Sequence, residues 1–159
     1  MSAESERHET EEERLDRNLT ELLNELRVAL PGVQVLFAFL LGVPFTQRFD
    51  DLKGYQEDIY YVTLVCAAAA TALLIAPSAN HRILFRLQDK RHIVFLANRL
   101  AIFGLAFLAL AMTGVVLLIT DLIFGRGATV IATSATALMF ACLWYVVPLV
   151  RRARLTERR

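Results

Sequence analysis

The sequence predicts an all-α integral membrane protein, a transmembrane four-helix bundle preceded by a cytoplasmic amphipathic helix. Hydrophobic residues make up 56% of its 159 residues, and charged residues only 21%. Four stretches contain no Asp, Glu, Lys or Arg: 28–47, 59–81, 100–120 and 127–150. Each is as long as the roughly 20 apolar residues that a helix needs to cross a bilayer. None has the polar stripe of a soluble bundle helix.

The N-terminal segment differs from the rest of the chain. Residues 1–10 are polar, and we expect a disordered tail there. Over 11–30, leucines recur at spacings of four, three and four, which predicts an amphipathic helix with a heptad-like seam. The seam consists of Leu15, Leu19, Leu22 and Leu26. Pro31 should kink the chain and separate this helix from the first span, because proline removes a helix hydrogen bond.

The partner of this leucine seam follows from charge. Residues 1–27 hold nine acidic and four basic side chains. Helices that lie on membranes usually present Lys and Arg, and anionic headgroups would repel an acidic face. We therefore expect the seam to contact a protein surface. That surface belongs to the chain's own bundle, to a second copy of the chain, or to another membrane protein.

The four spans are predicted at about 31–47, 59–78, 98–121 and 128–150, followed by a basic tail at 151–159. Of the 17 Lys and Arg residues, fourteen lie before the first span, between the second and third, or in the tail. Three lie in the other two loops. The positive-inside rule then predicts a multi-pass protein of the cell (inner) membrane with both termini in the cytoplasm.

Basic residues on the predicted cytoplasmic side should contact the acidic helix or anionic lipid headgroups. They are Arg82, Arg86, Lys90, Arg91, Arg151, Arg152 and Arg154. The segment 82–98 is itself amphipathic and predicts an interfacial helix that leads into the third span. Aromatic residues do not interleave with these cations as in proteins that bind single strands, so we expect no nucleic-acid partner.

Small residues predict how the spans pack. Thr129, Thr133, Ala137 and Ala141 recur every fourth residue in the last span, and similar lines run along the second. Because lipid provides no hydrophobic drive for helix association, such lines favour tight contacts. Cys66 and Cys142 should lie at depths too different for a disulfide, so we expect two free thiols.

Catalytic motifs do not occur in the sequence, which predicts a protein that is not an enzyme and needs neither metal nor other cofactor. A set of polar residues should lie at one depth on the cytoplasmic side: Gln34, Asn80, His81, Asn98 and Arg99. They form either a vestibule or small anion site around Arg99, or an interface where Arg99 snorkels and Gln34 makes one interhelical hydrogen bond.

Three runs of the sequence carry a resemblance to a known family. Residues Glu13–Phe45, Ala72–Arg86 and Ala97–Ala101 resemble a family of short actinobacterial four-span membrane proteins without an established function. Some members bear an automatic sodium:proton antiporter label. The resemblance implies an acidic cytoplasmic helix followed by four spans, and it implies no catalytic residues.

Two functional hypotheses follow. The first is a non-catalytic interaction or accessory subunit that acts through its acidic N-terminal helix. The alternative is an ion-translocating homo-oligomer, either a channel or a sodium/proton antiporter-like transporter. Ionisable groups inside a membrane are the usual mark of ion pathways, and the uncharged stretches contain no Asp or Glu. This favours the first hypothesis.

Overall fold

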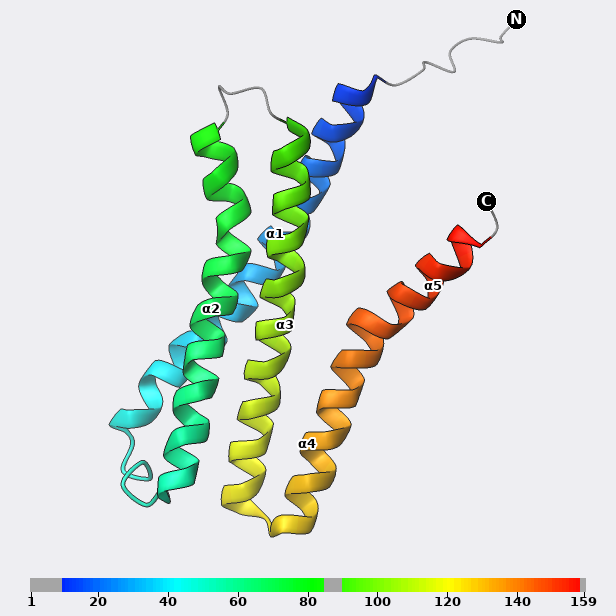
Figure 1. The fold of residues 1–159 in the computed structure, drawn as a ribbon. Coiled ribbons are helices and arrows are strands. Elements are labelled where there is room, and N and C mark those ends of the chain that lie inside the picture. Colours follow the sequence, from blue (N-terminus) through cyan, green and yellow to red (C-terminus); the bar gives the residue numbers. More distant parts are fainter. Residues whose placement is uncertain (1–9, 85–89, 158–159) are drawn as a thin grey trace, which may run out of the picture.

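The computed structural model describes residues 10–84 and 90–157, and all regular structure in these ranges is helical. Four long helical segments run back and forth (Figure 1). They are α1 (Glu11–Gly42), α2 (Gly54–Leu84), α3 (Lys90–Ile123) and α4 (Arg126–Ala141), the last continuing into further turns. All four segments are long and apolar enough to cross a membrane. The predicted number of helices that could span a membrane is thereby confirmed.

Helix α1 begins at a capping box, in which Thr10 accepts from the Glu13 backbone N–H while the Glu13 carboxylate accepts from that of Thr10. The helix then continues through Pro31 to Gly42. The predicted cytoplasmic helix 11–30 and the start of the first span are therefore parts of one helix. Pro31 lies on the exposed surface, and the loss of its one backbone hydrogen bond does not end the helix.

The end of α1 is tied to α2 by an aromatic pair. A short 3₁₀ turn, η1 (Val43–Phe45), follows α1. The buried Tyr60 hydroxyl donates to the Leu40 carbonyl at 2.8 Å. The ring of Phe49, from the connecting loop, meets the Tyr60 ring edge-on at 5.4 Å. These contacts fix the loop between α1 and α2 on the helix that follows it.

Helices α2 and α3 form the most extensive contact of the fold. Their interface is made of small residues, since Ala67, Ala70 and Ala111 have no exposed surface. A Cβ atom on Gly114 would overlap the Thr63 side chain, and one on Gly104 would lie 2.7 Å from Leu74. Close approach of the two backbones therefore depends on these glycines.

Helix α4 packs on α3, and among the described residues it has no direct contact with α1 or α2. The first two members of the small-residue line of α4 are covered, because Thr129 is buried and Thr133 half-buried, whereas Ala137 and Ala141 are exposed. Cys66 and Cys142 are both free thiols, as predicted.

A π-helical turn follows α4 and leads into the last helix. In this turn, η2 (Cys142–Val146), the Val147 backbone N–H donates to the Cys142 carbonyl five residues earlier. The physical cause is Pro148, which has no N–H to donate to the Trp144 carbonyl and whose ring crowds it. Beyond the turn, α5 (Val147–Thr156) leads away from the other helices (Figure 1).

The predicted interfacial helix 82–98 does not form a separate element. Residues 82–84 end α2 and residues 90–98 begin α3. Apolar side chains on several sides let both long helices continue into this segment. Residues 85–89, and with them Arg86, lie outside the described residues, as do residues 1–9 of the predicted tail.

Candidate functional site

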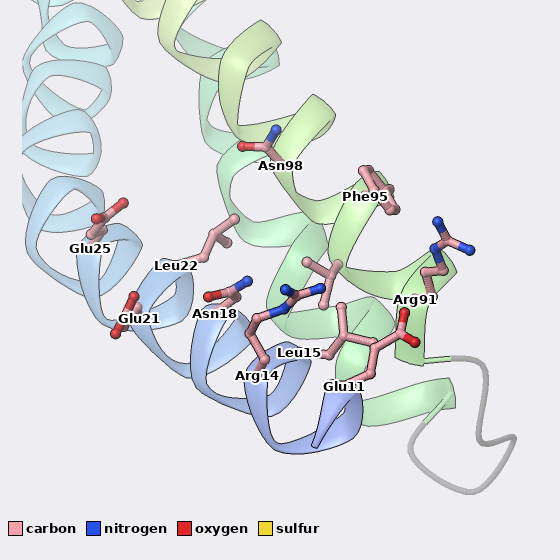
Figure 2. Close-up of a pocket in the computed structure, with 11 residues that line it drawn as sticks. Glu11, Arg14, Leu15, Asn18, Glu21, Leu22, Glu25, Arg91, Phe95 and Asn98 are labelled. Atoms are coloured by element: carbon pink, nitrogen blue, oxygen red, sulfur yellow. The ribbon is translucent and has the colours of Figure 1, made fainter. Parts of the chain in front are cut away.

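An open groove of about 450 Å³ lies between the start of α1 and the start of α3. Figure 2 shows its lining side chains, which converge from the two helices. Helix α1 contributes Glu11, Arg14, Leu15, Asn18, Glu21, Leu22 and Glu25, and α3 contributes Arg91, Val94, Phe95 and Asn98. We call these residues the acidic groove. It lies at the end of the molecule where α1 begins and α5 ends (Figure 1).

The leucine seam beside the groove is occupied by the chain's own helices. Leu19, 6% exposed, packs with Ile93 and Ala97 of α3. Leu26, 5% exposed, belongs to the main core cluster with residues of α2 and α3. Leu22 packs against both clusters. The seam was predicted to contact the chain's own bundle, a second copy of the chain or another membrane protein. In this structure it contacts the chain's own bundle.

A polar line runs along α1 next to the seam. Its members are spaced by three, four, three and four residues, so they follow one stripe of the helix surface. They are Glu11, Arg14, Asn18, Glu21 and Glu25. The Glu21 carboxylate also lies 3.8 Å from the Arg17 guanidinium. The stripe remains open to solvent because the seam beside it supplies the contact with α3.

The opposite wall of the groove combines a cation, an aromatic ring and an amide. The Arg91 guanidinium lies 6.0 Å from the centre of the Phe95 ring, within the range of a cation–π contact. Asn98 follows on the same face one turn later. Arg91 thus lies at the Glu11 end of the groove (Figure 2), while Glu21 and Glu25 line its other end. The contact between the basic segment and the acidic helix stays a prediction.

The predicted polar set is distributed over several places. Asn98 lines the acidic groove, whereas His81 lines a separate groove of about 400 Å³ together with Leu23, Ser78 and Arg82. Asn80 is half-buried beside His81. Gln34 and Arg99 are exposed and line neither groove. The structure therefore does not join these residues around Arg99.

The predicted basic contacts divide in the same way. Arg82 lies in the groove of His81, and Arg91 in the acidic groove. Arg151 and Arg152 line one face of α5, together with Pro148, Leu155 and Thr156. Arg154 is exposed on the same helix. The side chain of Lys90 lies outside the described residues.

A second polar cluster lies at the opposite end of the molecule. The Tyr55 hydroxyl and the Gln56 side-chain amide both donate to the Asp121 carboxylate, each at 2.7 Å. The sequence marks Asp121 only as the end of an uncharged stretch. The pairing arises because α2 begins where α3 ends (Figure 1).

Several threonine hydroxyl groups in the long apolar helices bond to their own helices, whereas the buried Thr133 hydroxyl has no hydrogen-bond partner among the described residues. Thr63, Thr71 and Thr113 each donate to the carbonyl four residues earlier, at 2.7 to 2.8 Å. This pattern is common for hydroxyl residues in membrane helices. It leaves these groups satisfied without any contact to a ligand.

One family model matches residues 8–148, and it describes a family of unknown function (DUF6328). The match agrees with the resemblance to a family without an established function. No curated protein and no solved structure matches the chain.

Proposed function

This chain belongs to DUF6328, a family of unknown function. We propose that it is a non-catalytic interaction or accessory subunit of the cell membrane. In this proposal the four helices cross the bilayer and both termini face the cytoplasm. The distribution of Lys and Arg along the sequence supports that orientation. The acidic groove is then exposed to cytoplasmic partners.

The observation that carries the proposal is that two neighbouring faces of α1 differ, one buried against the bundle and the other exposed in the groove. Leu19 and Leu26 are buried against the chain's own helices, so these two seam residues are not the partner surface, whereas Leu15 and Leu22 of the same seam line the groove. The adjacent polar stripe faces an open groove with leucine and phenylalanine side chains beside the charges. A surface that combines apolar area with fixed charges suits recognition of a helical segment.

The charge of the groove specifies the class of partner. Glu11, Glu21 and Glu25 outnumber the two arginines Arg14 and Arg91 that line it. An anionic headgroup would be repelled by the carboxylates, whereas a cationic amphipathic helix would be attracted to them. We therefore propose that the groove receives a helix with Lys or Arg beside apolar residues.

Ion translocation receives less support. The hydroxyl groups of Thr63, Thr71 and Thr113 are already bound to carbonyls of their own helices. Among the described residues, Thr133 alone has a buried side-chain oxygen without a hydrogen-bond partner, and one such group does not line a pathway. A pathway along these spans would need polar groups that are free to replace the hydration shell of an ion.

Native mass spectrometry of the tagged protein, extracted gently from its own membranes, tests the proposal. The expected result is a second chain, of the same or another protein, bound at fixed stoichiometry. Reversing two groove charges (Glu21→Lys with Glu25→Lys) should remove it. The matched control, Asp50→Lys with Asp51→Lys, makes the same charge change in the exposed loop at the other end and should leave the complex intact. The proposed role would be contradicted if the complex stayed intact in both doubly substituted proteins, or if the wild-type protein carried no second chain.

A further inference from the structure

The last helix of the chain has the chemistry that the acidic groove requires. We propose that α5 of a second copy of this chain docks in the acidic groove, so that neighbouring copies associate through tail and groove. This inference rests on the proposed docking role of the groove and names its occupant.

One face of α5 joins cations to apolar groups. Pro148, Arg151, Arg152, Leu155 and Thr156 line this face, at the three- and four-residue spacings of one helix side. Leu155 is 60% exposed, so an apolar side chain stands uncovered beside two guanidinium groups. This is the combination that an acidic groove with leucine and phenylalanine side chains can cover.

The dimensions also agree. The stripe from Glu11 to Glu25 rises about 21 Å along α1, and the ten residues of α5 span about 15 Å. The groove is thus long enough for the part of α5 that lies beyond the predicted fourth span, residues 151–156. In the docked arrangement, Arg151 and Arg152 face Glu21 and Glu25, and Leu155 covers the apolar part of the groove.

The chain's own α5 lies away from its own groove. Among the described residues, the backbone of α5 approaches no element other than the π-helical turn η2, which continues directly into it. Helix α4 contacts α3 alone of the other long helices, and α5 diverges from α1 to α3 beyond it (Figure 1). A cationic helix that projects sideways is placed to reach an adjacent molecule.

The membrane brings groove and tail of two copies to the same level. The start of α1 and the end of α5 lie at one end of the molecule (Figure 1). Copies that share one orientation in a membrane therefore present both surfaces at similar depth, and lateral approach is sufficient for docking. Each copy offers one groove and one tail, so the contact can repeat head to tail. The copies form a closed ring when the rotation from each copy to the next brings the last copy back to the first.

Cross-linking between two differently tagged copies tests the proposal directly. One copy carries Asn18→Cys in the groove and the other Leu155→Cys on α5, both in a Cys66→Ala, Cys142→Ala background. The full-length chains are reconstituted together in phosphatidylcholine vesicles and treated with a short bis-maleimide. We expect a covalent dimer that carries both tags. The control pair, Asn18→Cys with Leu138→Cys on an exposed part of α4, should give none.

Charge reversal then tests the docked arrangement. Arg151→Glu with Arg152→Glu should lower the cross-linked fraction about fivefold, the effect expected for two exposed ion pairs. Glu21→Arg with Glu25→Arg in the other copy should restore it. Recovery in the doubly reversed pair excludes misfolding as the reason for the loss.

The outcomes separate this inference from the proposed function. If tail and groove cross-link no more than the control pair, in vesicles where no anionic headgroup competes for α5, the inference is wrong. If the mass spectrum nevertheless holds a different protein that is lost on groove charge reversal, the docking role remains and only its occupant changes. A cross-linked fraction that neither charge reversal changes would also overturn the docked arrangement.

Discussion

The side-chain amide of Gln56 donates to the carboxylate of Asp121 over 2.7 Å, across 65 positions of the sequence. Gln56 is only 4% exposed, and its carbonyl oxygen accepts from the Lys53 backbone N–H at 2.9 Å. The Tyr55 hydroxyl donates to the same oxygen of Asp121. One carboxylate therefore joins the first turn of α2 to the last turn of α3.

Replacing Asp121 by alanine should destabilise the protein. The buried Gln56 amide would lose its 2.7 Å acceptor and keep only the Tyr55 hydroxyl at 3.4 Å, and a poorly satisfied buried donor costs about 1–3 kcal/mol. Thermal unfolding in detergent, followed by circular dichroism, measures the loss. Glu57→Ala changes an exposed carboxylate one residue beyond Gln56 and serves as the control. Equal unfolding temperatures for the two variants would contradict the role of this cluster.

Gly114→Ala should weaken the contact between α2 and α3. The added methyl group would overlap Thr63, and such overpacking costs about 1–3 kcal/mol. Gly32→Ala is the matched control, because the space around Gly32 in α1 is open. The control should be neutral or slightly more stable, since alanine favours a helix over glycine. A Gly114→Ala protein as stable as the wild type would show that the helices can separate without cost.

Leu26→Ala should destabilise the bundle by about 2–5 kcal/mol, the usual cost of truncating a buried leucine. Val28→Ala, at a position that is 82% exposed, should change the unfolding free energy by less than about 0.5 kcal/mol. The same unfolding assay compares them. If Leu26→Ala removed a bound partner and left the unfolding temperature unchanged, the seam would be a partner surface and not part of the core.

Pro148→Ala should convert the π-helical turn to regular α-helix. The alanine N–H can donate to the Trp144 carbonyl, so the extra residue in the turn is no longer needed. Spin labels at Phe95→Cys and Leu155→Cys, in a background without Cys66 and Cys142, report the direction of α5. Pulsed electron spin resonance should give a different distance distribution from that of the Pro148 protein. Val146→Ala, which keeps the proline, should leave the distribution unchanged.

The number of helices was predictable because charged side chains are excluded from lipid. Each sufficiently long uncharged stretch of the sequence therefore corresponds to one long apolar helix. The ends of the helices were less predictable. Pro31 suggested a boundary, but at an exposed position it removes one hydrogen bond and α1 continues through it. The segment 82–98 suggested its own helix, yet its two parts extend α2 and α3.

The candidate site was partly visible in the sequence. The spacing of Leu19 and Leu26 identified an apolar seam, but periodicity cannot say which surface covers it. The polar stripe from Glu11 to Glu25 has the same period and could have been found by examining the neighbouring face. The contribution of Phe95 depends on how α3 lies against α1, and the pairing of Gln56 with Asp121 depends on where two helices meet. These are properties of the assembled bundle.

The uninterrupted course of α1 has a mechanical consequence. Its 32 residues extend about 48 Å, well beyond a hydrocarbon core of about 30 Å. A rod of this kind has no joint at which its two ends could turn separately. Leu26, Val33 and Leu40 hold this rod against α2 and α3 along its length. A displacement of one end of α1 therefore tilts the three helices together.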